Sequence, residues 1–248
     1  MLRPRKKYTV HELRQLKGRR ALTHIHVKSP EEAAAAEAAG VDLMSCPFDS
    51  PEAQARLPLL AAAAPESFLS GSTPHGLASC EEAIRIGFRA LELGASSVYC
   101  SASPWIIEGM AREGIPVVGH LGLVPRHVTW TGYRAIGKTA AEARILYGRM
   151  KELENAGAYA AELEVVPHRL ARFLSANTSL LLMSLGSGTG CDTQFLFSDD
   201  LLEERVAAFR EYVADVNEGR FPEAKHLVEM DEAEFESFRE SLGGIALG

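Results

Sequence analysis

Two glutamates and a histidine have the residue types and spacing that proton transfer requires. Glu162 and Glu164 alternate with apolar residues in the stretch ELEV (162–165), so in a β-strand both carboxylates point to the same side. Glu164 lies nearer the carboxyl end, where a pocket that raised its pKa would make it a general base; a solvated or ion-paired carboxylate is the alternative. His120 follows a short apolar run, with glycines on either side, at a predicted strand end that a ligand could reach. These residues predict acid–base chemistry.

A second set of residues could hold a metal ion. His24 and His26 share one face of a predicted strand, and imidazole nitrogens suit transition metals. Asp49, which follows the next predicted strand, could add an oxygen ligand. Histidines that are buried and hydrogen-bonded in a core are the alternative. The four cysteines form no CxxC pair, which argues against a compact zinc motif and favours reduced, mostly buried thiols.

Two loops have the composition of ligand-binding segments. Residues 126–138 mix aromatic, basic and glycine residues without a sustained period, which is typical of a lid. Residues 186–190 read GSGTG, and the backbone N–H groups around Gly186 and Ser187 could hold a carboxylate or phosphate, although a plain turn explains the glycines equally well. His75 lies in another loop that either faces the site or forms an exposed turn.

A repeating βα unit must position these residues. A Ser or Thr cap, a helix rich in alanine and glutamate, a glycine and a short apolar strand recur along the chain. The repeat predicts an α/β fold, a (β/α)8 TIM barrel with an added C-terminal helix at 231–242, and a doubly wound open sheet is the alternative. Strands are predicted at 21–27, 41–46, 67–71, 97–100, 116–120, 159–166, 179–185 and 195–197, and a long helix at 201–218.

Composition narrows the class of protein. The 248 residues, 46% hydrophobic and 24% charged, suit one globular barrel domain, 1–248, with a C-terminal extension from about 219. A net charge of -7 and a pI near 5.7 argue against a general nucleic-acid or membrane-surface role, so a small-molecule substrate is expected. The N-terminus lacks the apolar stretch of a signal peptide and no segment reaches membrane-spanning length, from which we expect a cytoplasmic enzyme.

Five stretches, taken in order, resemble ketopantoate hydroxymethyltransferase, a (β/α)8 family of the phosphoenolpyruvate mutase and isocitrate lyase superfamily. They are PVVGHLGLVPR (116–126), TGYRAIGK (131–138), LENAGAYAAELEVVPHRLA (153–171), GSGTGCDTQFLFSDDL (186–201) and FREYVADVNEGRFPEAKH (209–226). The resemblance implies an enzyme of pantothenate biosynthesis. In that family a strand-six glutamate forms the enolate of a 2-oxo acid, which attacks a one-carbon unit from methylenetetrahydrofolate. On this resemblance Glu164 matches the base and His120 a substrate-contacting histidine.

The resemblance also implies Mg²⁺, which that family binds through aspartates after strands two and three. Where the family has Gly-Asp-Ser, this chain reads SCPFDS (45–50), so Asp49 and Ser50 match after a shift of one residue. Gly71 aligns with the strand-three aspartate, and Ser72 follows it. The lysine and glutamate after strand four fall on Tyr99 and Ser101. The substrate-binding candidates are thus Ser50, Ser72, Tyr99, Ser101, Gly186 and Ser187, and the metal candidates are Asp49, His24 and His26.

Three functions follow from these patterns. The first is a hydroxymethyltransferase-like enzyme that acts on a 2-oxo acid or related carbonyl compound. The second is a lyase or hydrolase of the same superfamily with a rebuilt site, and the third is a non-catalytic homologue. The resemblance further implies a homo-oligomer, and the C-terminal helix offers an apolar face for it.

Overall fold

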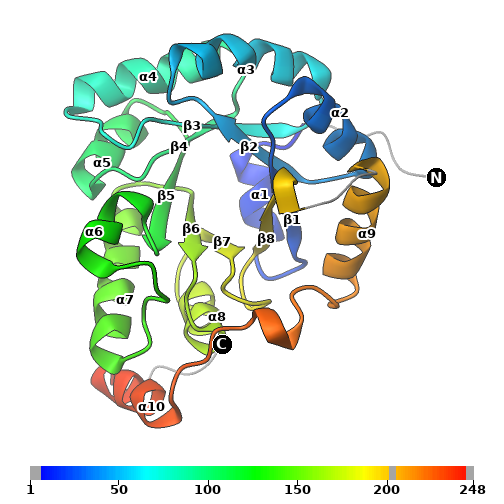
Figure 1. Cartoon of the computed structure of the whole chain (residues 1–248). Helices are drawn as coiled ribbons and strands as arrows, with labels where there is room; N and C mark the ends of the chain where they lie inside the picture. Colours follow the sequence, from blue (N-terminus) through cyan, green and yellow to red (C-terminus); the bar gives the residue numbers. More distant parts are fainter. Residues whose placement is uncertain (1–6, 201–204, 244–248) are drawn as a thin grey trace.

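Eight parallel strands close into a barrel in which each strand pairs with its sequence neighbour and β8 pairs with β1 (Figure 1). The computed structural model describes residues 7–200 and 205–243. The closed barrel confirms the predicted TIM fold over an open sheet. The strands are β1 (Leu22–His26), β2 (Leu43–Pro47), β3 (Phe68–Ser72), β4 (Ser97–Tyr99), β5 (Val117–Gly122), β6 (Ala160–Glu164), β7 (Leu181–Leu185) and β8 (Thr193–Phe197).

Helices surround this barrel, and several begin where the sequence places a cap. The side chains of Ser29, Ser50, Ser79 and Thr139 each accept the backbone N–H three residues on, which satisfies a donor that has no partner within the helix. The α-helices are α1 (Val10–Leu16), α2 (Pro30–Ala39), α3 (Pro51–Ala63), α4 (Cys80–Glu92), α5 (Pro104–Arg112), α6 (Val128–Thr131), α7 (Ala140–Asn155), α8 (His168–Ala176), α9 (Arg205–Asn217) and α10 (Glu232–Ser241). The 3-10 turns are η1 (Pro125–His127), η2 (Ser198–Asp200) and η3 (Ala224–His226).

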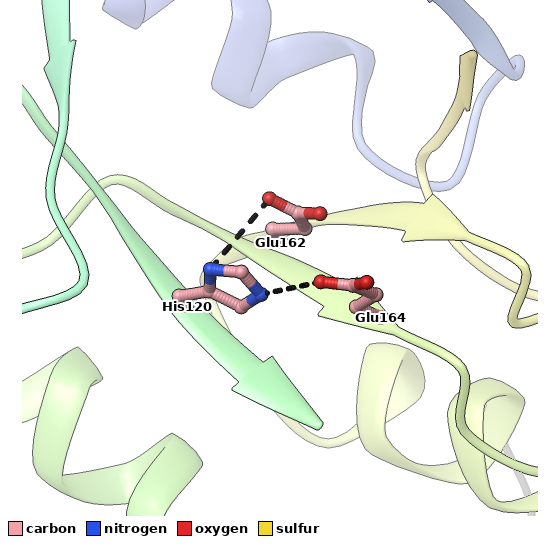
Figure 2. Close-up of side chains that lie close together, drawn as sticks. All are labelled: His120, Glu162 and Glu164. Carbon is pink, nitrogen blue, oxygen red and sulfur yellow. Dashed lines mark hydrogen bonds and ion pairs between the residues drawn. The ribbon is translucent and has the colours of Figure 1, made fainter. Parts of the chain in front are cut away.

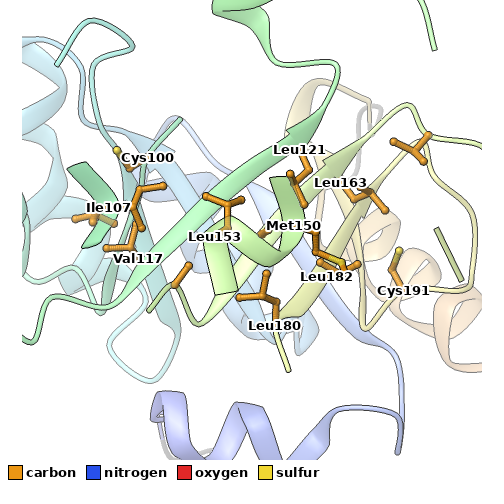
Figure 3. Packing of buried hydrophobic residues seen from close by; sticks show 14 of the residues in the cluster. Cys100, Ile107, Val117, Leu121, Met150, Leu153, Leu163, Leu180, Leu182 and Cys191 are labelled. Carbon is orange, nitrogen blue, oxygen red and sulfur yellow. The ribbon is translucent and has the colours of Figure 1, made fainter. Parts of the chain in front are cut away.

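The hydrophobic core has two layers because successive strand residues face opposite sides. The outer layer lies between strands and helices, where Val117, Leu121 and Leu163 pack near Met150 and Leu153 of α7 (Figure 3). The inner layer fills the barrel mainly at its amino-terminal end, and only its Tyr99 also lines the cavity described below. It consists of Leu13, Leu22, Leu43, Phe68, Tyr99, Val118, Tyr159, Ala160, Leu181 and Met183. The amino-terminal end is therefore packed, which leaves the carboxyl end for a cavity.

Two parts of the chain differ from the sequence prediction, and a third is described only in part. Helix α1 was not predicted; its capping box at Thr9 starts it, and its buried Leu13 closes the amino-terminal end of the barrel. The predicted lid contains the short elements η1 and α6. The predicted helix 201–218 is described from Arg205 to Asn217, and its first residues, 201–204, lie outside the described part.

The predicted C-terminal helix forms and packs on the outside of the barrel next to α7 (Figure 1). Phe235 and Phe238 are fully buried, and the ring centroids of Phe238 and Phe173 of α8 lie 5.2 Å apart. This packing covers much of the apolar face that the sequence analysis offered to a neighbouring subunit. Within residues 7–200 and 205–243, no helix has the length and apolar character required to cross a bilayer.

Candidate active site

A cavity of about 270 Å³ opens at the carboxyl ends of the strands. This is the end of a parallel barrel where loops and strand termini converge and where barrel enzymes place their chemistry. Polar side chains from most strands reach it. Its described lining consists of His26, Ser45, Pro47, Asp49, Ser72, Thr73, His75, Tyr99, Ser101, His120, Pro125, Glu162, Glu164, Leu185, Phe195 and Phe197.

His120 lies between two glutamates of the neighbouring strand (Figure 2). Its Nε2 is 3.0 Å from Oε2 of Glu164, and its Nδ1 is 3.8 Å from Oε2 of Glu162. The register of β5 and β6 sets this arrangement, because His120 pairs with Glu162 and Gly122 pairs with Glu164. The three side chains that the sequence marked for acid–base chemistry thus converge.

The backbone around Glu164 is held in an unusual conformation. Val165 adopts a positive φ of 49°, which a β-branched residue rarely does. Its N–H donates to the carbonyl of Leu185 at 2.8 Å, and its carbonyl accepts the N–H of Ile136 in the predicted lid. Gly122, at φ 84°, passes so close that a Cβ there would lie 2.1 Å from the Glu164 carbonyl oxygen. These contacts fix where β6 ends and so aim the Glu164 side chain.

The two glutamates have different surroundings. The Glu162 side chain is 6% exposed, and burial together with the charge of Glu164 raises its pKa well above the ordinary value. The Glu164 side chain is 18% exposed and lies at the open end of the strand. Glu162 therefore favours its neutral, protonated form. Two carboxyl groups with unlike environments are a common basis for dividing acid and base roles.

The structure separates the two histidines of β1. His26 lines the cavity, and its Nδ1 lies 3.0 Å from the hydroxyl of Ser45; burial and the charge of Lys28 lower its pKa to about 4. His24 is buried deeper in the barrel, where its ring stacks on Phe195 with centroids 4.0 Å apart. Burial lowers the pKa of His24 to about 3, with a smaller contribution from the charge of His26.

The predicted metal ligands do not come together. Among the described residues, the one group of three such side chains whose ligand atoms lie within 4.8 Å of one another is His120, Glu162 and Glu164. His24 does not line the cavity because it lies one layer below His26, while Asp49 is at the exposed rim. The set Asp49, His24 and His26 is thus corrected: it forms no three-ligand group in this structure.

The site of Mg²⁺ implied by the resemblance does not fit this cavity. The residues that line it from the ends of β2 and β3 are Pro47 and Ser72, neither of which is a carboxylate. Gly71, which the sequence alignment placed at the strand-three aspartate, faces the helix layer, since a Cβ there would lie 3.3 Å from Phe48. The cavity-facing equivalent is therefore Ser72. Asp49 alone on this side would be a weak site for an ion that demands octahedral oxygen coordination.

Three of the predicted substrate-binding residues line the cavity: Ser72, Tyr99 and Ser101. The Tyr99 ring meets His120 edge to face at 6.2 Å, and its buried hydroxyl has no hydrogen-bond partner among the described residues. Ser101 Oγ lies 3.1 Å from Nδ1 of His75, which places the loop histidine at the cavity as well.

The other three predicted residues have structural contacts instead. Ser50 caps α3. Ser187 is fully buried; its hydroxyl donates to the Leu163 carbonyl at 2.7 Å and accepts the N–H of Val166. Gly186 borders a neighbouring cavity between β7, β8 and α9. The glycines of this loop permit close packing on α8, because a Cβ at Gly188 would lie 2.6 Å from His168. Ser50 and Ser187 therefore lie outside the cavity.

Sequence reasoning missed several lining residues, notably Ser45, Thr73 and Phe197. Ser45 lies two residues after the inward-facing Leu43 in β2, so both side chains point to the same face and strand alternation could have identified Ser45. In β8, Phe197 likewise lies two residues after Phe195, and both side chains line the cavity. Thr73 follows β3 in a loop, where periodicity carries no such information.

Comparisons with known proteins find relatives that share one name. The family model described as ketopantoate hydroxymethyltransferase matches residues 55–206. A 3-methyl-2-oxobutanoate hydroxymethyltransferase of Pseudothermotoga lettingae is 34% identical over 184 residues, which cover 64% of this chain and 69% of the relative. The enzyme of that name from Thermotoga neapolitana is 28% identical and covers 88% of this chain and 95% of its own length.

A solved structure supports the fold alone. The 2,3-dimethylmalate lyase, a member of the PEP mutase/isocitrate lyase superfamily, matches with a TM-score of 0.59 and 15% identity, over 94% of this chain and 96% of the lyase. At 15% identity, this likeness concerns the arrangement of strands and helices and not the function.

Proposed function

Because this chain belongs to the ketopantoate hydroxymethyltransferase family, we propose that its cavity converts a 2-oxo acid, or a related carbonyl compound, into an enolate that forms a new C–C bond. Methylenetetrahydrofolate is the one-carbon donor that the family implies. The observation that carries the proposal is the 3.0 Å contact between His120 and Glu164 at the carboxyl end of the barrel. A carboxylate there can accept the proton from the carbon next to the carbonyl.

The three acid–base residues each have a part in this proposal. Glu164 removes the proton, and His120 holds the carboxylate in position and shares the proton that it gains. Burial and the charge of Glu164 raise the pKa of Glu162, which favours its protonated form and so reduces negative charge beside the enolate. The proposal uses no metal-dependent step, since the cavity lacks the carboxylates expected at β2 and β3.

Two neutral donors take the place of a cation at the developing oxyanion. His26 is neutral at physiological pH, because its pKa is lowered to about 4, and it can donate from the ring nitrogen not engaged by Ser45. The Tyr99 hydroxyl is buried, and no group in the described part of the chain forms a hydrogen bond with it. Fixed donors of this kind stabilise charge that develops in a transition state.

A lyase or hydrolase reaction is the second candidate. It is favoured by the ends of β2 and β3, where the residues that line the cavity, Pro47 and Ser72, are not carboxylates. Such a reaction would also pass through a carbonyl compound and an enolate, but would break a C–C bond.

The test is exchange of the single α-proton of 3-methyl-2-oxobutanoate in D2O, followed by NMR. Glu164→Gln should slow exchange by about a hundredfold to ten-thousandfold, because the amide keeps the shape but cannot accept a proton. Glu113→Gln, at an exposed glutamate at the end of α5, is the matched control. Equal exchange by Glu164→Gln and the parent would make Glu164 a structural carboxylate.

A further inference from the structure

The charge of the active cavity does not match the proposed substrate. Its described lining includes three carboxyl groups, from Asp49, Glu162 and Glu164, and no lysine or arginine. A 2-oxo acid brings a carboxylate of its own, which the carboxylates of Asp49 and Glu164 would repel. With no metal site at β2 and β3, a cation from another part of the protein must hold that carboxylate.

A second, smaller cavity of about 200 Å³ adjoins the first and shares Ser101 and His120 with it. Its other walls come from the start of α5, the end of β5, η1 and α7. Two arginines line it, Arg126 from η1 and Arg149 from α7, and Glu152 is the one acidic residue in its described lining. Because the two cavities share His120, both arginines border a cavity that this histidine also lines.

Both arginines are available to an anion. In the part of the chain that the structure describes, neither forms an ion pair with a carboxylate. Arg126 Nε donates to Nε2 of His127 at 3.2 Å, which requires that nitrogen to be unprotonated. Burial and the charges of Arg126 and Arg149 lower the pKa of His127, which agrees with that contact. His127 thus orients Arg126 without adding a charge of its own.

We infer that Arg126 and Arg149 form a carboxylate-binding subsite that holds the acid group of the substrate while its carbonyl lies beside His120. The guanidinium group matches a carboxylate in shape and donates paired N–H groups, so two of them can hold one anion at a defined angle. This inference rests on the proposed 2-oxo acid substrate. It assigns the specificity for an acid to residues outside the barrel cavity itself.

The test is calorimetric binding of 3-methyl-2-oxobutanoate to the full chain, without the one-carbon donor. Arg126→Ala and Arg149→Ala should each weaken binding about tenfold, as loss of a charge-assisted contact implies. The affinity of Arg149→Lys should fall between those of the parent and Arg149→Ala, because lysine keeps the positive charge but lacks the paired N–H groups of arginine. Glu152→Gln should strengthen binding, since it removes the opposing charge. Arg144→Ala, on the same helix but outside both cavities, is the matched control.

A neutral analogue, 3-methyl-2-butanone, separates the acid group from the rest of the molecule: the arginine variants should not change its affinity. Circular dichroism of each variant checks that the fold is intact. The inference is overturned if the parent does not bind the acid, or if folded Arg126→Ala and Arg149→Ala both bind it within twofold of the parent. Binding that depends on the arginines without α-proton exchange would uphold the subsite and refute the proposed reaction.

Discussion

The imidazole of His120 faces Glu164 with one ring nitrogen, at 3.0 Å, and Glu162 with the other, at 3.8 Å. The two glutamates lie on the same face of β6, yet Glu162 is enclosed and Glu164 is near the opening of the cavity. One histidine therefore connects a carboxyl group that favours its neutral form with one that can meet a substrate.

Replacement of His120 by asparagine should slow α-proton exchange by about tenfold to a hundredfold, less than the loss of Glu164, because the base remains but its partner cannot share the proton. The rate constant for deuterium exchange measures this effect. His11→Asn, at an exposed histidine of α1 at the far end of the barrel, should exchange at the parental rate. A larger loss for His120→Asn than for Glu164→Gln would reverse the assigned roles.

Glu162→Gln should stabilise the protein increasingly as the pH rises. The folded-state pKa of Glu162 is raised above its unfolded value of about 4.3, so the unfolded chain releases this proton first and the parent loses stability as pH increases above that value. Glutamine does not titrate. The difference in Tm between variant and parent, measured with EDTA from pH 4 to pH 8, should grow with pH; a constant difference would contradict the raised pKa.

Gly122→Ala should destabilise the protein by at least about 3 kcal/mol and reduce α-proton exchange, because the new Cβ would collide with the Glu164 backbone and displace β6. Gly114→Ala is the matched control. Gly114 has a similar positive φ, 79°, but no atom lies within 4 Å of the position that a new Cβ would take, so backbone strain alone should cost about 1 kcal/mol. Urea unfolding measures both, and equal losses would show that the contact at Gly122 relaxes freely.

Magnesium should not activate the protein, and zinc should inhibit it. The β2 and β3 strand ends lack the carboxylates for magnesium, whereas His120, Glu162 and Glu164 form a nitrogen-and-oxygen group that suits zinc and includes the proposed base. Ketopantoate formation with magnesium and methylenetetrahydrofolate should stay well below an ordinary turnover of about 10 per second. Treatment with EDTA should leave α-proton exchange unchanged, and strong activation by either ion would contradict this.

We also expect a homo-oligomer. Trp130 and Tyr133, in the predicted lid, are 90% and 85% exposed, which is costly for large aromatic side chains in a lone subunit. Light scattering should show a dimer or larger species. Trp130→Ser should lower the molar mass of the assembly, whereas Ser241→Ala, on the surface of α10, should leave it unchanged. A parent protein that stays monomeric would contradict the expectation.

Local sequence patterns determined much of the fold. Caps such as Ser29 and Thr139 begin helices because a side-chain oxygen satisfies N–H groups of the same segment, so few distant contacts are needed. Strand alternation likewise placed Glu162 and Glu164 on one face before any neighbour was known. Alternation also placed His24 and His26 on one face of β1. It could not show that His24 lies in the packed interior of the barrel and His26 in the cavity.

Tertiary structure alone decided which residues meet. The contact of His120 with Glu164 joins residues 44 positions apart, and it depends on the register of β5 against β6. The depth of each layer along the barrel put His26 in the cavity and His24 against Phe195. The direction of β3 turned Gly71 toward Phe48 and Ser72 inward. Register, depth and strand direction arise from packing between distant segments. This is why spacing along the chain marked the acid–base residues but wrongly grouped His24 and His26 with Asp49.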